Sequence, residues 1–185
     1  MIKEKFQDSR MKRGEAPLPR NPVDALALFI ASGFGSGFIP FAPGTFGSLV
    51  GSFIVYLLVS LPAWDAPLLQ NVLVLASLLL AALGIWSAAR AERILGRKDA
   101  SQIVIDEVCG QVISFVFIAR ALVKPGPQLL CWLVIGFGLF RLFDIFKPYP
   151  INELQHLNGG LGVMMDDIFA GIYAALVLSL LTYIW

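Results

Sequence analysis

Three short polar clusters interrupt an otherwise apolar chain of 185 residues. Their charged members are Asp106, Glu107, Arg141, Asp144, Lys147, Asp166 and Asp167. Carboxylate oxygens are the hard ligands that Mg²⁺ prefers, and arginine and lysine bind phosphate oxygens. Carboxylates, a divalent metal and basic side chains together are typical of phosphoryl chemistry. These residue types therefore predict Mg²⁺-assisted chemistry on a phosphate group.

Each cluster also has a purely structural interpretation. Asp106-Glu107 could favour the positive end of a helix dipole. Arg141 and Asp144 are spaced as an i, i+3 ion pair at the end of an apolar helix. Asp166-Asp167 follows a glycine-rich turn and could cap the next helix. A cap uses a single carboxylate, whereas this last pair supplies two, which favours metal binding.

A glycine-rich stretch, residues 33–37, precedes a second polar segment at 43–48. Glycines let backbone N–H groups approach an anion, and Thr45 or Ser48 could cap the helix that follows. Close helix packing through small residues is the competing interpretation. The single histidine, His156, is interpreted as an exposed loop residue rather than a proton shuttle. Cys109 and Cys131 are interpreted as small buried hydrophobes, without a disulfide or zinc site.

The composition points to a membrane as the surroundings of these clusters. Hydrophobic residues make up 57% of the chain and charged residues 15%, against about 45–50% and about 25% in soluble domains. This composition argues against disorder, a coiled coil, a nucleic-acid-binding groove and an ordinary soluble enzyme. Five apolar stretches approach the length of about 20 residues that a spanning helix needs. They are residues 45–61, 68–89, 108–123, 129–146 and 168–185.

The expected fold is therefore all-α, a multihelical integral membrane protein with about five transmembrane helices. A sixth apolar stretch, residues 24–39, is short and ends in glycines and prolines. It is predicted to be an interfacial or re-entrant helix, with a secretory signal as the alternative. Residues 1–22 are expected to be a charged cytoplasmic tail, and residues 23–185 a single membrane-embedded domain.

Charge placement predicts the orientation. With five spans, all but two of the 14 basic residues fall on one side, the exceptions being Arg120 and Lys124. The positive-inside rule places that side in the cytoplasm. All the carboxylates of the three clusters belong to the same side. A site at the cytoplasmic surface of a bilayer points to a lipid phosphate as substrate.

Taken in order, the polar segments resemble the phosphatidylglycerophosphatase A family. The matching elements are Gly33-Phe34-Gly35-Ser36-Gly37, Pro43-Gly44-Thr45-Phe46-Gly47-Ser48, Asp106-Glu107, Arg141-x-x-Asp144-x-x-Lys147-Pro148-x-Pro150 and Gly159-Gly160-x-Gly162-x-Met164-x-Asp166-Asp167-x-x-Ala170-Gly171. The resemblance implies a multi-pass enzyme of the bacterial inner membrane. It implies hydrolysis of phosphatidylglycerophosphate to phosphatidylglycerol and phosphate, with Mg²⁺ as cofactor. Family members often have a histidine before the glycine pair, where this chain has Asn158.

On this hypothesis the catalytic residues are Asp106, Glu107, Asp144, Asp166 and Asp167. Four of these acids would bind the metal, with Asp144 as either a further ligand or the partner that orients Arg141. The phosphate-binding residues would be Thr45, Ser48, Arg141 and Lys147. The expected partners are the phospholipid and the bilayer, without nucleic acid; the oligomeric state stays open. The alternative function is a transporter or channel for a cation or phosphate, since intramembrane carboxylates and broken helices are also typical of such proteins.

Overall fold

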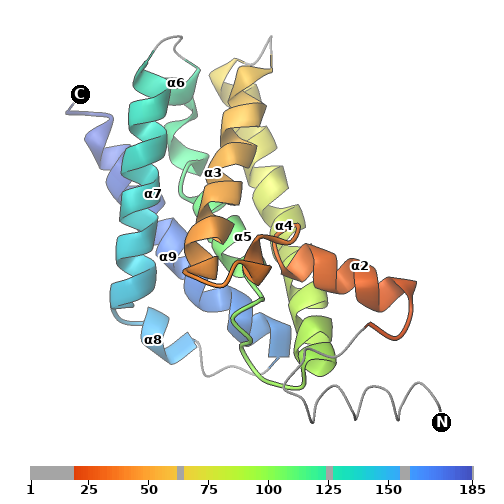
Figure 1. The fold of residues 1–185 in the computed structure, drawn as a ribbon. Coiled ribbons are helices and arrows are strands. Elements are labelled where there is room, and N and C mark those ends of the chain that lie inside the picture. Colours follow the sequence, from red (N-terminus) through yellow and green to blue (C-terminus); the bar gives the residue numbers. More distant parts are fainter. Residues whose placement is uncertain (1–18, 62–64, 124–126, 155–158, 185) are drawn as a thin grey trace, which may run out of the picture.

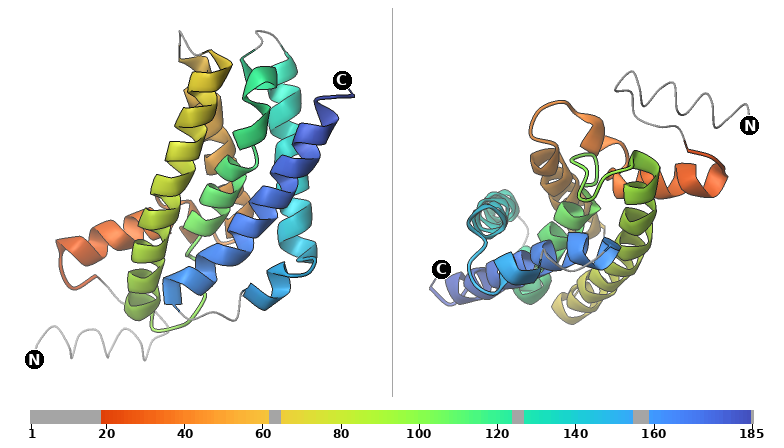
Figure 2. Two further views of the ribbon diagram at one scale, coloured as in Figure 1. Left: turned by 180° about the vertical axis from the view of Figure 1, so that it is seen from behind. Right: turned by 90° about the horizontal axis from the view of Figure 1, so that it is seen from below.

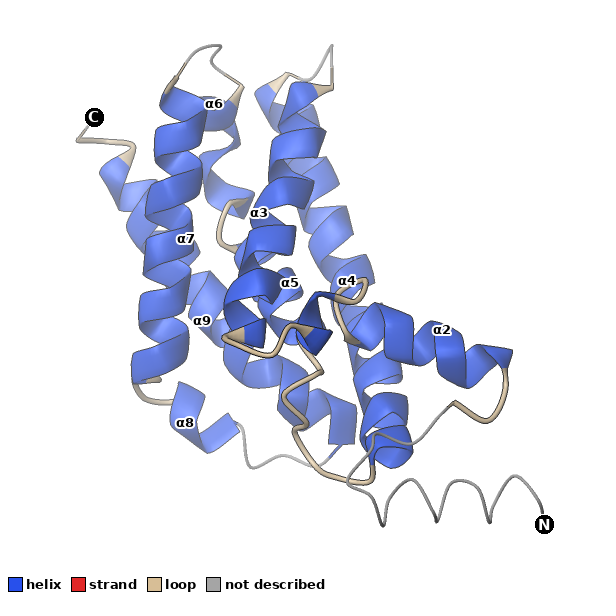
Figure 3. Ribbon diagram, viewed as in Figure 1, coloured by secondary structure: helices blue, strands red, loops and turns tan. Residues whose placement is uncertain are grey.

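The computed structural model describes residues 19–61, 65–123, 127–154 and 159–184. This part of the chain consists of helices and loops, with no strand (Figure 3). The helices are α2 (Pro22–Ala31), η1 (Ser36–Phe38), α3 (Pro43–Ser60), α4 (Ala66–Leu95), α5 (Ile105–Ile113), η2 (Val116–Ile118), α6 (Ala119–Leu122), α7 (Gln128–Phe146), α8 (Ile151–Leu154) and α9 (Gly159–Leu181). The all-α prediction is confirmed.

Four of these helices are long and apolar enough to cross a membrane, namely α3, α4, α7 and α9. They stand side by side in one upright bundle (Figure 1). Among these four helices, the largest departure from the predicted spans is at α9, which begins at Gly159 and not near residue 168. Gly160 lies so close to α4 that a Cβ atom there would collide with the carbonyl oxygen of Ile85. The glycines of this segment therefore allow close helix contact, and Asp166 and Asp167 lie inside the helix and not at its cap.

The remaining predicted span, residues 108–123, is interrupted in the structure. It is made of α5, the 3-10 turn η2 and α6 in succession. Viewed along the bundle, α5 lies in the centre, with α3, α4, α7 and α9 around it (Figure 2). At the break, the Ser114 hydroxyl donates to the carbonyl oxygen of Gly110 at 3.0 Å. Irregular backbone is tolerated at membrane depth where protein encloses it, and this segment is largely buried.

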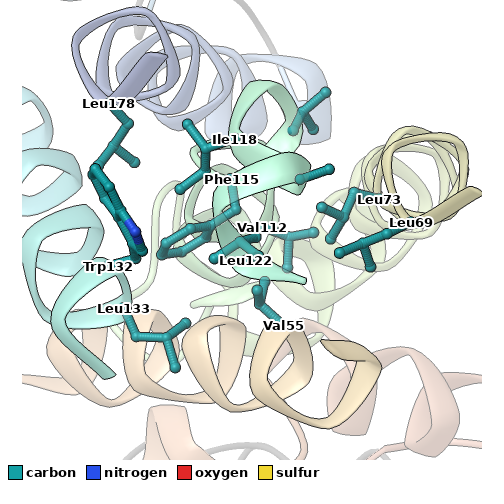
Figure 4. Packing of buried hydrophobic residues seen from close by; sticks show 12 residues of the cluster. Val55, Leu69, Leu73, Val112, Phe115, Ile118, Leu122, Trp132, Leu133 and Leu178 are labelled. Atoms are coloured by element: carbon teal, nitrogen blue, oxygen red, sulfur yellow. The ribbon is translucent and has the colours of Figure 1, made fainter. Parts of the chain in front are cut away.

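Apolar side chains from five segments fill the half of the bundle that contains α6. Phe115 and Leu122 come from the central segment, and Val55, Leu73 and Leu178 from the surrounding helices (Figure 4). All five are at most 1% exposed. This packing leaves the polar clusters to the opposite half of the bundle.

Glycines set the distance between α5 and its neighbours. A Cβ atom on Gly171 of α9 would collide with the carbonyl oxygen of Gly110 on α5. On the other side of α5, a Cβ atom on Gly51 of α3 would lie 2.7 Å from the Val108 carbonyl oxygen. Small residues of this kind let membrane helices approach closely. They hold α5 directly between α3 and α9.

The helix α2 lies beside the bundle and is steeply inclined to it (Figure 1). Asn21 caps it by accepting a hydrogen bond from the Asp24 N–H at 2.8 Å. The Arg90 side chain of α4 binds Asp24 at 3.1 Å. The predicted short helix followed by a glycine-rich loop is thus present, with Phe29 and other apolar side chains exposed.

The prediction of two buried cysteines is half right. Cys109 is buried, but Cys131 is exposed on α7. An outward face of a bundle in lipid carries no penalty for apolar exposure, so sequence apolarity alone could not separate the two positions.

Candidate active site

Three carboxylates converge where α5 packs against α9. Asp106 and Glu107 lie in the first turn of α5, and Asp167 lies well inside α9. One oxygen of each residue lies within 4.8 Å of the others. The structure thus brings together three of the four predicted metal ligands from segments about 60 residues apart.

Two of these carboxylates carry buried oxygen atoms without the partners that burial normally requires. Asp106 and Asp167 are 8% and 3% exposed. Oδ1 of Asp106 and Oε2 of Glu107 have no hydrogen-bond partner among the described residues. Buried charges are stable only when paired or bound to a metal. Hard oxygen donors with free lone pairs fit a divalent cation such as Mg²⁺, so the donor set suits a metal ion.

Arg141 and Asp144 stand one helical turn apart at the lower end of α7. Their side chains form an ion pair of 2.6 Å, as the i, i+3 spacing predicts. Asp144 also lies within hydrogen-bonding reach of Asp167 on α9. Asp144 therefore joins the arginine to the acidic cluster.

Lys147 ends α7 and faces the fourth predicted ligand, Asp166. The two side chains form an ion pair of 2.7 Å. Partial burial lowers the pKa of Lys147, but the hydrogen bond to Asp166 and the nearby carboxylates outweigh it and raise the pKa overall. Lys147 thus carries a full positive charge at neutral pH. Its backbone has a φ of 42°, a conformation that favours glycine and costs other residues about 1–2 kcal/mol.

Asp166 differs from the other three acids because it has a cationic partner. Only its Oδ1 atom is buried without a partner among the described residues. The structure places it next to the acidic cluster but outside the group of three. Its assignment as a metal ligand stays a prediction.

The start of α3 reaches the same place. A Cβ atom on Gly44 would collide with Oε1 of Glu107 and lie 3.3 Å from Nη1 of Arg141. The α3 cap differs from the prediction, because Ala42 occupies it without a side-chain hydrogen bond. Ser48 donates instead to the Gly44 carbonyl oxygen at 2.9 Å, and the Thr45 N–H donates to Ala42 at 2.9 Å. Phosphate binding by Thr45 and Ser48 stays a prediction.

The glycine-rich loop at 33–37 does not present free N–H groups to an anion. Its five N–H groups donate to oxygen atoms of residues 30, 29, 32, 33 and 32, at 2.9–3.3 Å. Gly37 also packs so closely on the carbonyl of Gln102 that a Cβ atom would collide with it. The loop therefore supports the segment that leads into α5, and the small-residue interpretation of these glycines fits better than the anion cradle.

Two polar residues near the site were not predicted from the sequence, namely the buried Gln111 and the half-buried Ser52. Both carry side-chain atoms without a hydrogen-bond partner in the described part of the chain. The position of Gln111 could have been predicted from its i+4 spacing from Glu107, because residues four apart lie on one face of a helix. His156 and Asn158 lie outside the described residues.

Fold and site together define a class of protein. It is a membrane-embedded helical bundle that carries an acidic, metal-compatible cluster with an arginine and a lysine beside it at one end. The family model for phosphatidylglycerophosphatase A matches residues 29–182. The chain belongs to this family of lipid phosphatases, which confirms the resemblance noted in the sequence.

Curated relatives cover most of the chain. A phosphatidylglycerophosphatase A of Haemophilus influenzae is 38% identical over 165 residues, covering 88% of this chain and 90% of the relative. The Escherichia coli protein of that name is 34% identical over 166 residues, covering 89% and 86%. A Bacteroides thetaiotaomicron protein, named as a candidate phosphatidylinositol-3-phosphatase, is 38% identical over 159 residues, covering 86% and 95%. No solved structure gives a significant match.

Proposed function

We propose that this protein is a Mg²⁺-dependent phosphatidylglycerophosphatase that acts at the cytoplasmic leaflet. The observation that carries the proposal is the cluster of Asp106, Glu107 and Asp167, whose oxygens lie within 4.8 Å of one another. Arg141 and Lys147 lie beside it. Family membership and the names of two relatives support the same substrate.

In this proposal each side chain has a separate task. Asp106, Glu107 and Asp167 would hold the metal, with Asp166 as the further ligand expected from the sequence. When bound, the metal supplies positive charge at the phosphate and lowers the pKa of a water molecule. Arg141, held by Asp144, presents its remaining N–H groups to the phosphate oxygens, and Lys147 adds a point charge. These groups offset the negative charge of the transition state.

The reaction is a hydrolysis of a phosphate monoester. Water oxygen forms a bond to phosphorus, and the bond from phosphorus to the glycerol oxygen breaks. The glycerol oxygen takes up a proton, and inorganic phosphate leaves. Because the site lies among span ends, the acyl chains of the substrate can stay in the bilayer throughout.

A second substrate is favoured by one relative. The Bacteroides thetaiotaomicron protein and the Haemophilus influenzae protein are both 38% identical to this chain. The name of the first refers to a lipid with an inositol head group. Phosphatidylinositol 3-phosphate presents the same phosphate monoester on a different polyol. It is therefore the comparison substrate for the test.

The test is phosphate release by purified protein in detergent micelles containing either lipid. We expect release from phosphatidylglycerophosphate with Mg²⁺, no release with EDTA, and loss of release in Asp167→Asn. Circular dichroism and gel filtration check that the variant is folded. Folded wild-type protein that releases no phosphate from either lipid would contradict the proposal and favour the transporter alternative, to be measured as ion or phosphate flux in liposomes.

A further inference from the structure

Two polar side chains that lie deeper in the bundle than the carboxylates have no hydrogen-bond partner among the described residues. Gln111 on α5 is fully buried, with 0% exposure. Neither its Nε2 nor its Oε1 atom forms a hydrogen bond within the described residues, and the same holds for the buried Oγ atom of Ser52 on α3. An unpartnered buried amide is costly, and one retained in a native structure calls for an explanation.

Gln111 borders the same helix interface as the acidic cluster. A Cβ atom on Gly47 of α3 would lie 3.3 Å from Cβ of Glu107, and one on Gly51 would lie 2.7 Å from Cβ of Gln111. Gly47 faces Glu107, and Gly51 faces Gln111. Because the members of each helix are four residues apart, these two contacts are one helical turn apart along the interface of α3 and α5. Gln111 therefore lies one helical turn, about 5.4 Å, beyond Glu107, and Ser52 directly follows Gly51.

The chemistry of these atoms limits what can bind them. An amide offers two N–H donors and a carbonyl acceptor, and a serine hydroxyl can donate or accept. A neutral group that both donates and accepts, as a hydroxyl does, can satisfy the donors and the acceptors together. A glycerol esterified at two of its three oxygens keeps one hydroxyl, on the carbon next to the one that bears the phosphate. The phosphate and the free hydroxyl of this glycerol are therefore on neighbouring carbons. With the phosphate at the acidic cluster, the hydroxyl can lie near Gln111, one helical turn deeper.

We propose that Gln111 and Ser52 form a hydroxyl-binding subsite that recognises the polyol of the lipid head group. The inference rests on the proposed function, because it concerns the substrate of that reaction. The phosphate is held at the acidic cluster by Arg141 and Lys147. The head-group hydroxyl accepts a hydrogen bond from the Gln111 amide and donates one to its carbonyl oxygen or to Ser52.

The test compares two substrates that differ in one atom. One is phosphatidylglycerophosphate, and the other is its deoxy analogue, in which hydrogen replaces the head-group hydroxyl. We expect wild-type protein to prefer the hydroxylated substrate by about tenfold in kcat/KM, as one neutral hydrogen bond provides. Gln111→Met, which keeps the side-chain volume, should bring this ratio close to one. Ser52→Ala should lower it in part.

The matched control is Gln70→Met, the same substitution at an exposed position on α4, which should keep the wild-type ratio. The melting temperature in detergent shows whether each variant is folded, and Ser52→Ala carries the test if Gln111→Met does not fold. A ratio of one in the wild type, or an unchanged ratio in both variants, would overturn the subsite and indicate only a structural water. Folded wild type that hydrolyses neither lipid would instead overturn the proposed function.

Discussion

The carboxylates of Asp106, Glu107 and Asp167 repel one another at the distances observed. In an enclosed, low-dielectric place this repulsion is strong, and Arg141 and Lys147 are each already paired with another acid. A bound divalent cation would remove the repulsion and satisfy the unpartnered oxygens. At the residue scale, the site is therefore expected to be more stable with metal than without.

We therefore expect Mg²⁺ to stabilise the folded wild-type protein. At a Mg²⁺ concentration one hundred times the Kd, binding should stabilise the folded state by about 2.7 kcal/mol. We expect the melting temperature in detergent to rise with Mg²⁺ and to fall back with EDTA. In Asp167→Asn the Mg²⁺-dependent rise should shrink or vanish. An equal rise in both proteins would contradict metal binding by this cluster.

Gly44 offers a second test at the residue scale. In Gly44→Ala the new methyl group would displace the Glu107 carboxylate, while alanine suits the first turn of α3 at least as well. We expect a protein that folds normally but loses about 10²-fold in kcat/KM, as a shift of about 1 Å can cause. Gly138→Ala is the matched control, because no atom outside its own helix lies within 4 Å of the added Cβ atom. Full activity in Gly44→Ala would show that α3 does not shape the site.

At the element scale, the contact between α5 and α9 decides whether the acids meet. Gly110 and Gly171 allow it, and the carbonyl oxygen of Asp167 itself lies against Gly110. Separating the two helices would move Asp167 away from Asp106 and Glu107. The glycines of this interface therefore act on both stability and chemistry.

Gly171→Ala should test this coupling. The added methyl group meets backbone atoms that cannot rotate away, and overpacking of this kind costs about 1–3 kcal/mol. We expect a lower melting temperature together with weaker Mg²⁺-dependent stabilisation. Gly138→Ala on α7 should instead leave stability unchanged or raise it by up to about 1 kcal/mol. Equal melting temperatures for the two variants would contradict the close packing of α5 on α9.

At the scale of the whole molecule, the charges predict which side of a membrane each end of the bundle faces. The start of α5 and the ends of α4 and α7 lie at the same end as α2 (Figure 1). The basic residues Arg90, Arg93, Arg97, Lys98, Arg141 and Lys147 belong to that end. The positive-inside rule predicts that it faces the cytoplasm.

Thiol labelling should reveal this orientation. In a Cys131→Ser background the remaining natural cysteine, Cys109, is buried. Ser101→Cys and Gln128→Cys then place exposed thiols at opposite ends of the bundle. We expect a membrane-impermeant maleimide to label residue 101 only in inverted vesicles and residue 128 only in intact spheroplasts. The reverse pattern would contradict a cytoplasmic site.

Much of the fold was readable from composition and spacing. Long apolar stretches cannot stay in water, and their backbone groups must be satisfied within the segment, so four long helices were predictable. The i, i+3 pair of Arg141 and Asp144 was also predictable, because helix geometry alone brings such residues together.

What the sequence could not provide is the depth and neighbours of each polar group. It indicated that Asp166 and Asp167 belong together as ligands, whereas the structure pairs Asp166 with Lys147 and turns Asp167 toward α5. Likewise, the loop glycines at 33–37 serve packing, which only their contact with Gln102 reveals.

By itself, then, the sequence determined that the chain forms long apolar helices, and it predicted that the charges gather at one side and that acids with phosphate-binding cations carry the chemistry. These properties depend on residue type and on spacing within one helix. Only the tertiary structure decided which acids meet, that Gly44 lies against Glu107, and that Gln111 lies buried beyond it. Those facts depend on how closely two helices approach, and glycine contacts between distant segments set that distance.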